Sequence, residues 1–186
     1  MSSIAPFDAT KKQLGTARKL MRVGKFVEHF KAAAIASDST SLDPVIKATT
    51  VGRQLGYATY MLLDSANILD ATGIRKSAHG ATLLRNANKA WFSGIAFSIV
   101  QGVYALYGLQ GRAKVVSAST DPEKVVEQKK LAKELDAVKI QLLSDLCDVA
   151  IPAAALGWVN LDDGIVGLAG TTSSLLGVWS QWKKTA

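Results

Sequence analysis

The chain has 186 residues, 48% of them apolar, and its 22 Lys and Arg against 15 Asp and Glu give a formal net charge of +7. This length and a mean hydropathy of +0.16 fit one ordinary domain or a small membrane protein, and they lean away from a typical soluble enzyme. Cys147 is the single cysteine, which excludes an intrachain disulfide and so a disulfide-stabilised secreted scaffold.

Residues 11–34 are predicted to form one long amphipathic helix. At helical spacing, five basic side chains fall within about 60° of one another: Lys11, Arg18, Arg22, Lys25 and His29. The opposite face carries Ala17, Leu20, Met21, Val23, Gly24, Val27, Phe30 and Ala34. Residues 1–36 hold seven Lys and Arg against two carboxylates, so most of the net charge is local. The pattern is typical of a helix in the lipid headgroup layer, although taken alone it fits a solvated surface helix equally well.

A second helix is predicted over residues 45–72, with Gly73 as its C-cap. Its middle is apolar apart from Asp64 and Asn67. A carboxylate near the centre of a bilayer costs about 2.5–3.5 kcal/mol. We therefore expect this helix to pack on other helices or to lie at the membrane interface rather than to span.

Residues 90–111 form the strongest candidate for a membrane span. The segment contains no charged residue and lies between Lys89 and Arg112. At about 1.5 Å per residue it covers about 33 Å, enough to cross a hydrocarbon core of about 30 Å. Small residues recur every four positions and would let another helix approach closely: Gly94, Ser98 and Gly102. The alternative interpretation is the central helix of a soluble bundle.

After a linker at 114–124, a charged helix docked on a neighbour is predicted over residues 123–143. Residues 164–182 are a possible second span of 19 uncharged residues, with close-approach positions at Gly170 and Ser174. The segment ends with Trp179, Trp182, Lys183 and Lys184, which resemble an interface anchor.

The lysines at the C-terminus also predict the orientation of the chain. Lys183 and Lys184 follow the second possible span, whereas residues 144–163 contain no Lys or Arg. The excess of positive charge predicts a cytosolic C-terminus and, with two spans, a cytosolic N-terminus. The same two lysines resemble the dilysine signal that coat proteins read.

The sequence predicts no catalytic, cofactor-binding or metal-binding residues. Cys147 beside two carboxylates is expected to be inert, and Asp162 and Asp163 lack further ligands at a loop-type spacing. Phosphate-loop, serine-hydrolase and zinc-protease motifs are absent from the sequence. Nucleic-acid binding is disfavoured because the basic helix carries a full apolar face.

Three blocks, in this order, closely resemble the peroxin-eleven family and its fungal branch in particular. They are ARKLMRVGKFVEHFKAAA at 17–34, GYATYMLLDSANILDATGIRK at 56–76, and DVAIPAAALGWVNLDDGIVGLAGTTSSLLGVWSQWK at 148–183. The resemblance implies a single all-α membrane domain over residues 1–186, with an interfacial helix and one to two transmembrane helices. It further implies a peroxisomal membrane protein that elongates and proliferates peroxisomes, forms homo-oligomers, and recruits a dynamin-related fission GTPase with its membrane adaptor.

In that family the helix matching residues 11–34 remodels the membrane. The resemblance assigns insertion into anionic phospholipid to Leu20, Met21, Val27 and Phe30, and lipid-facing charge to Arg18, Lys19, Arg22 and Lys25, with Lys11 on the same basic face. Family members usually carry a further helical stretch before this helix, and here ten residues precede Lys11.

Two other functions compete with membrane remodelling. One is a channel for small metabolites, for which the candidate spans offer few polar side chains: Ser93, Gln101, Thr172 and Ser173. The other is a soluble helical adaptor without a membrane role.

Overall fold

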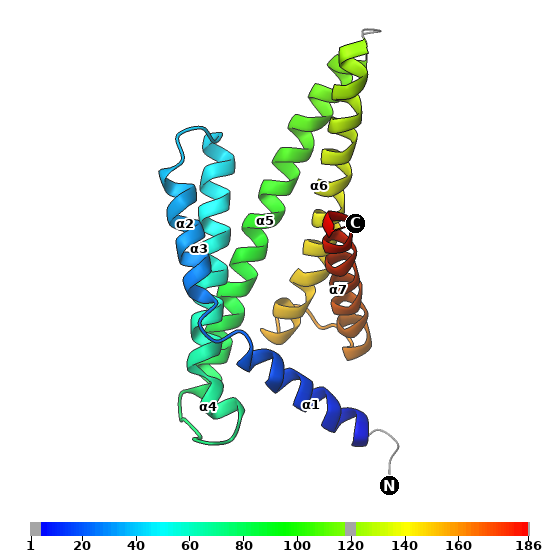
Figure 1. Cartoon of the computed structure of the whole chain (residues 1–186). Coiled ribbons are helices and arrows are strands. Elements are labelled where there is room, and N and C mark those ends of the chain that lie inside the picture. Colours follow the sequence, from blue (N-terminus) through cyan, green and yellow to red (C-terminus); the bar gives the residue numbers. More distant parts are fainter. Residues whose placement is uncertain (1–4, 118–121, 186) are drawn as a thin grey trace.

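The computed structural model describes residues 5–117 and 122–185, and all regular structure within those ranges is helical (Figure 1). The helices are α1 (Ala5–Leu20), α2 (Phe26–Asp38), α3 (Pro44–Ala66), α4 (Ile68–Ala71), α5 (Gly80–Ser117), α6 (Pro122–Ala155) and α7 (Asp163–Thr185). The prediction of an all-α fold is therefore confirmed.

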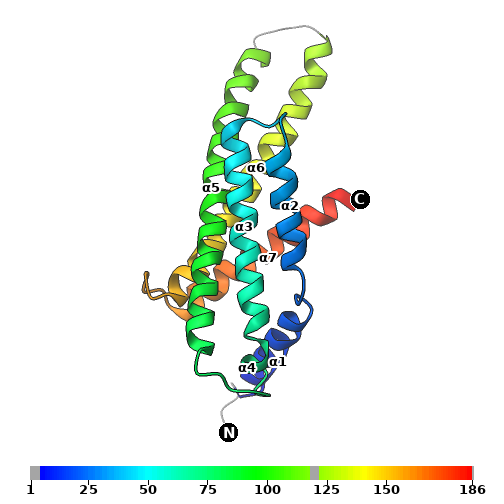
Figure 2. The same ribbon diagram turned by 90° about the vertical axis from the view of Figure 1, so that its left-hand side faces the viewer.

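Helix α5 is the centre of the bundle. Helix α3 packs along one side of it and α6 along another, while α2 lies on α3 and α7 lies on α6 (Figures 1 and 2). The side chains of Ala58 in α3, Ala87 in α5 and Ile95 in α5 are fully buried at these contacts. The far ends of α5 and α6 project as a two-helix hairpin beyond the end of the α2–α3 pair (Figure 1).

The small residues of α5 make two different helix contacts possible. A Cβ atom on Gly56 of α3 would lie 2.6 Å from the Cα atom of Gly94, so the two backbones meet where both residues lack a side chain. On the α6 side, a Cβ atom on Gly102 would lie 2.6 Å from a methyl carbon of Leu142, and the Ser98 hydroxyl donates to Asp145 at 2.6 Å. These positions bring helices of the same chain together.

The predicted single helix over residues 11–34 is wrong, because the chain breaks between α1 and α2. Residues 21–25 form a turn, and Gly24 in that turn has φ +85°. A residue with a side chain rarely adopts this left-handed conformation, and a regular right-handed helix cannot contain it. The periodic pattern counts Gly24 as one more small apolar residue, and so it does not reveal the break.

The other predicted helices differ from the observed ones in their bounds. The predicted helix at 45–72 is divided into α3 and the one-turn α4, and Gly73 follows with φ +78°. The candidate span at 90–111 lies inside the 38 residues of α5. The charged helix predicted at 123–143 continues to Ala155 and contains Pro152 in its last turn. Proline there removes one i→i−4 hydrogen bond, and the helix ends three residues later. Residues 118–121 of the predicted linker lie outside the described residues.

Candidate membrane-binding site

Helix α1 leaves the bundle obliquely at the end where α5 begins (Figures 1 and 2). None of its residues is buried, and its contacts are limited to α3 and α4. Helix α2, in contrast, packs along α3 and buries Ala33 and Ala36 against it. The two halves of the predicted amphipathic helix therefore differ: α1 makes few contacts with the rest of the chain, and α2 is part of the bundle.

Two of the predicted lipid-facing cations lie against α3 instead. The Lys19 ammonium donates to the Asp64 carboxylate at 2.7 Å, and Asp64 is only 7% exposed. The Arg22 side chain lies near the Tyr60 hydroxyl of α3. Burial and the nearby Asp64 carboxylate raise the pKa of Tyr60, against an opposing effect of Arg22 and Arg18, so the hydroxyl stays neutral at physiological pH. These polar contacts hold the base of α1 on the bundle.

The predicted inserted face stands on the open surface around the bend. The exposed fractions of its side chains are 54% for Leu20, 73% for Met21, 58% for Val27 and 41% for Phe30. The predicted cations Lys11, Arg18 and Lys25 are exposed beside them. Exposed apolar side chains and exposed cations in the same segment are the features that an anionic membrane surface would attract.

His29 does not extend this basic rim. Its Nδ1 atom lies 2.7 Å from the Gln54 amide oxygen of α3, and its ring centroid lies 5.8 Å from that of Tyr57. The basic face predicted for residues 11–34 is thus partly turned toward the protein, while the outer side of α2 exposes apolar side chains that include Ile35 at 61%.

Helix α5 is the one helix among the described residues that is long and apolar enough to cross a membrane, and little of its most apolar window is buried. Its two ends have different surroundings. Trp91 stacks on Tyr60 with ring centroids 5.1 Å apart, and Phe92 contacts Trp158 at 4.9 Å. At the other end, Arg112 pairs with Glu127 of α6 at 3.7 Å, next to the exposed Lys129, Lys130 and Lys133.

Helix α7 packs on α6 through one narrow side. Ser173 lies 3.3 Å from Ser144 between their hydroxyl oxygens, and Gly170 faces Ile151. Ser174 is exposed and donates to the Gly170 carbonyl, so it does not mediate this packing. The remaining surface carries exposed large apolar residues, which are Ile165, Leu168, Leu175, Val178, Trp179 and Trp182. The Lys183 ammonium lies 5.0 Å from the Trp179 ring centroid, as in a cation–π contact.

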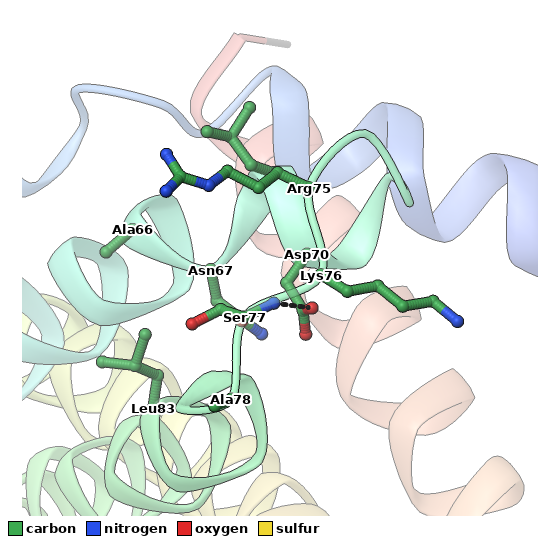
Figure 3. A pocket seen from close by; sticks show the side chains of 9 residues that line it. Ala66, Asn67, Asp70, Arg75, Lys76, Ser77, Ala78 and Leu83 are labelled. Atoms are coloured by element: carbon green, nitrogen blue, oxygen red, sulfur yellow. Dashed lines mark hydrogen bonds between the residues drawn. The ribbon is translucent and has the colours of Figure 1, made fainter.

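Sequence reasoning missed a polar pocket where α3, α4 and the start of α5 meet. Asn67, Asp70, Arg75, Lys76 and Ser77 contribute to its lining (Figure 3). Polar side chains at Asn67 and Asp70 within a mostly apolar stretch were the available signal, and the sequence does not show that they gather in one cavity.

Comparison with known proteins gives a consistent result. A family model described as peroxisomal biogenesis factor 11 (PEX11) matches residues 1–182. Peroxisomal membrane protein PMP27 of Saccharomyces cerevisiae is 28% identical over 184 residues, which cover 93% of this chain and 78% of that protein. Peroxisomal biogenesis factor 11 of Schizosaccharomyces pombe is 23% identical, covering 98% and 79% of the two chains, and human peroxisomal membrane protein 11A is 23% identical, covering 89% and 74%. No solved structure matches the chain.

Proposed function

This chain belongs to the peroxisomal biogenesis factor 11 family, and we propose that it bends and elongates the peroxisomal membrane by inserting the apolar surface around the α1–α2 bend into one leaflet. The family consists of peroxisomal membrane proteins that act in peroxisome proliferation. It is a family of biogenesis factors and not a known enzyme family.

The exposed apolar row at the bend carries this proposal. Leu20, Met21, Val27 and Phe30 are 41–73% exposed, although burying a side chain of this kind stabilises by about 1.5–3 kcal/mol when burial is complete. Partial insertion of the four therefore contributes several kcal/mol, and each exposed cation near an anionic surface adds about 1 kcal/mol. Insertion to headgroup depth expands one leaflet relative to the other, which favours positive curvature.

The contacts at the C-terminal end of α1 connect the inserted helix to the rest of the bundle. Lys19 and Arg22 fix the end of α1 to α3, while the helix itself is free to lie along the membrane. Curvature generated at α1 is therefore transmitted to a bundle that contains the candidate span α5. No nucleotide is needed for this step, because the energy comes from insertion of apolar surface.

Both termini are proposed to face the cytosol. Helices α5 and α6 pack side by side and run antiparallel (Figure 1), so if α5 crosses, α6 brings the chain back beside it to the side where α1 lies, although α6 is not itself apolar enough to count as a candidate span. Trp158 beside Phe92 supports this return, because it puts the α6–α7 connection next to the first turns of α5. If α7 then lies along the membrane with Trp182 and Lys183 at the interface, both ends share one side. A crossing by α7, the second span expected from the sequence, would follow the return by α6 and would separate the two ends.

The expected partners are a second copy of this chain, the dynamin-related GTPase with its adaptor, and coat protein. Gly94, Ser98 and Gly102 were expected to let another helix approach closely, and the helices that they contact are α3 and α6 of the same chain. We therefore propose that copies associate through the exposed apolar side of α7, and that elongated membrane then recruits the dynamin-related GTPase and its adaptor. The position of Lys183 over Trp179 supports an interface anchor more than a coat-protein signal.

A channel is less well supported by the same contacts. Gln101 donates to the Thr50 hydroxyl at 3.1 Å, and Ser93 donates to the Ala90 carbonyl at 2.8 Å. Ser173 faces Ser144 in the α6–α7 contact. The polar side chains that could have lined a lumen are thus engaged in hydrogen bonds within and between helices, which leaves only Thr172 of the four exposed.

The wedge is tested by replacing Leu20 and Val27 with Glu in the full-length protein reconstituted into anionic liposomes. We expect membrane tubulation, seen by electron microscopy, to be lost. The matched control is Val115→Glu with Val126→Glu, which makes the same charge change at side chains 75% and 71% exposed on the projecting α5–α6 hairpin. Tubulation that survives the first pair of changes, or is lost equally with the control pair, contradicts the proposal.

A further inference from the structure

The polar pocket at the base of the bundle has the character of a binding site. It is a cavity of about 360 Å³, near the lower end of the range for small-ligand sites, roughly 300–1,000 Å³. Its lining comes from the end of α3, from α4, from the loop that follows and from the first turn of α5 (Figure 3). Helices α1 and α4 lie at this same end of the molecule in both views (Figures 1 and 2).

A buried hydrogen-bond acceptor stands in the wall of this pocket. Asn67 is 5% exposed, and its Oδ1 atom has no hydrogen-bond partner among the described residues. The atom lies 3.3 Å from the position that a Cβ on residue 80 would occupy. Because a buried acceptor without a donor destabilises the fold, a ligand that brings an O–H or N–H group to this atom is favoured.

The neighbouring carboxylate is held in place and has capacity to accept more. Asp70 accepts the backbone N–H of Ser77 at 2.9 Å through Oδ1. Its Oδ2 atom lies against Gly80, where any side chain would collide with it. The Asn67 amide oxygen and the Asp70 carboxylate thus both lie against Gly80, and the missing side chain at this position lets them approach the same point.

Two basic side chains also contribute to the lining of the pocket. Arg75 and Lys76 are exposed and contribute to the lining from the loop at the rim of the pocket. Their charged ends extend in opposite directions in Figure 3, so both side chains would turn inward to meet one phosphate. With Asp70 they give this site a formal charge of +1. The chemistry that matches is a phosphate for the two cations, with adjacent hydroxyl groups for Asn67 and Asp70.

We propose that this pocket binds the headgroup of an inositol phospholipid, with the phosphate on Arg75 and Lys76 and inositol hydroxyls on Asn67 and Asp70. The single negative charge of phosphatidylinositol complements the site. A choline headgroup does not, because its trimethylammonium group carries no N–H donor. The pocket shares its end of the bundle with α1, so a lipid held there would place the wedge at the surface of the same leaflet.

The headgroup site and the apolar side chains proposed to insert into the membrane are different residues, so the two proposals can be tested separately. None of Leu20, Met21, Val27 or Phe30 lines the pocket. Loss of headgroup binding with intact tubulation would reject the site alone, and loss of tubulation with intact headgroup binding would reject the wedge alone.

Native mass spectrometry of the full chain in detergent, with phosphatidylinositol or phosphatidylcholine added, tests the proposal. We expect phosphatidylinositol to be retained at least about tenfold more tightly. Asn67→Leu should reduce its binding about three- to tenfold, the effect of one hydrogen bond. Arg75→Gln with Lys76→Gln should reduce it by more than about tenfold, because both phosphate contacts are lost. The exposed side chains at 75 and 76 keep this second variant informative if the first is unstable.

The matched control is Lys129→Gln with Lys130→Gln, an adjacent pair of exposed lysines on α6, which should leave retention unchanged. Equal retention of the two lipids, or an equal loss in the control, overturns the proposal. An unchanged Asn67→Leu variant that folds also overturns it, because binding would then be surface charge only. Displacement of the lipid by inorganic phosphate at equal concentration would assign the site to free phosphate instead.

Discussion

The ion pair between Lys19 and Asp64 offers the sharpest test of how α1 is held. The two side chains meet at 2.7 Å, with Lys19 28% and Asp64 9% exposed. Lys19→Met removes a charge-assisted hydrogen bond worth about 1.5–3 kcal/mol. The full penalty for an unpaired buried charge, about 3–5 kcal/mol, is not reached because the lysine side of the pair is open to water. We therefore expect Lys19→Met to lower the free energy of unfolding by about 2 kcal/mol. This value is smaller than the penalty for a fully buried pair and larger than the contribution of a surface pair.

Thermal unfolding of the detergent-solubilised protein measures this loss. For a chain of this size 1 kcal/mol shifts Tm by about 2–4 °C, so Lys19→Met should lower Tm by about 4–8 °C. Asp64→Leu in the Lys19→Met background should recover much of the difference, because no buried carboxylate then remains unpaired. Hydrogen exchange at residues 5–20 should accelerate in Lys19→Met, since α1 has no buried residue to hold it otherwise.

The double-mutant cycle decides the question. If the two changes are additive within about 0.5 kcal/mol, the pair contributes no coupling and the anchor at Lys19 is refuted. Arg18→Met is the control, because Arg18 is exposed on the same helical turn and should leave both Tm and exchange close to those of the unchanged chain.

Two further outcomes are expected. Gly56→Ala puts a Cβ atom against the Gly94 backbone and should lower the free energy of unfolding by about 2 kcal/mol. Gly108→Ala is the control, because its Cβ atom meets open space and should raise the free energy of unfolding by about 0.5–1 kcal/mol. A Tm of Gly56→Ala at or above that of the unchanged chain would contradict the close α3–α5 contact. Trypsin added to intact peroxisomes should remove the C-terminal lysines but spare Lys129 and Lys130 at the far end of the α5–α6 hairpin; cleavage at those two lysines would contradict the proposed crossing.

The helical class and the uncharged part of α5 follow directly from the sequence. Both depend on local composition and period, which residues 90–111 carry without interruption. The anchor of α1 does not follow in this way, because Lys19 and Asp64 are 45 positions apart and nothing local links them. Helical spacing leaves Lys19 outside the five cations of the basic face, and only the family resemblance placed it in the lipid-facing set. Its partner Asp64 is known only from the packing of α1 on α3.

The bend at Gly24 was missed for a different reason. Periodicity weighs each residue by its hydropathy, and glycine scores as a small apolar residue that suits the apolar face. What ends α1 is the backbone conformation with φ +85°, to which that measure is blind. The same blindness explains why the residues around Asn67, where α3 gives way to α4, were predicted as one helix.

If α5 crosses the membrane as proposed, the charges of α6 limit the depth at which it can do so. The uncharged stretch of α5 runs to residue 111, but its last turns lie beside the part of α6 that carries Lys129, Lys130 and Lys133. Each lysine at the bilayer centre would cost about 2.5–3.5 kcal/mol. Nearer the start of α5, the neighbouring part of α6 is apolar except for carboxylates, and its buried Asp145 accepts hydrogen bonds from Ser98 and Gln141. The lipid-covered band therefore shifts toward the end of the bundle from which α1 emerges. At that level, an interfacial α1 and a crossing α5 can act on the same leaflet.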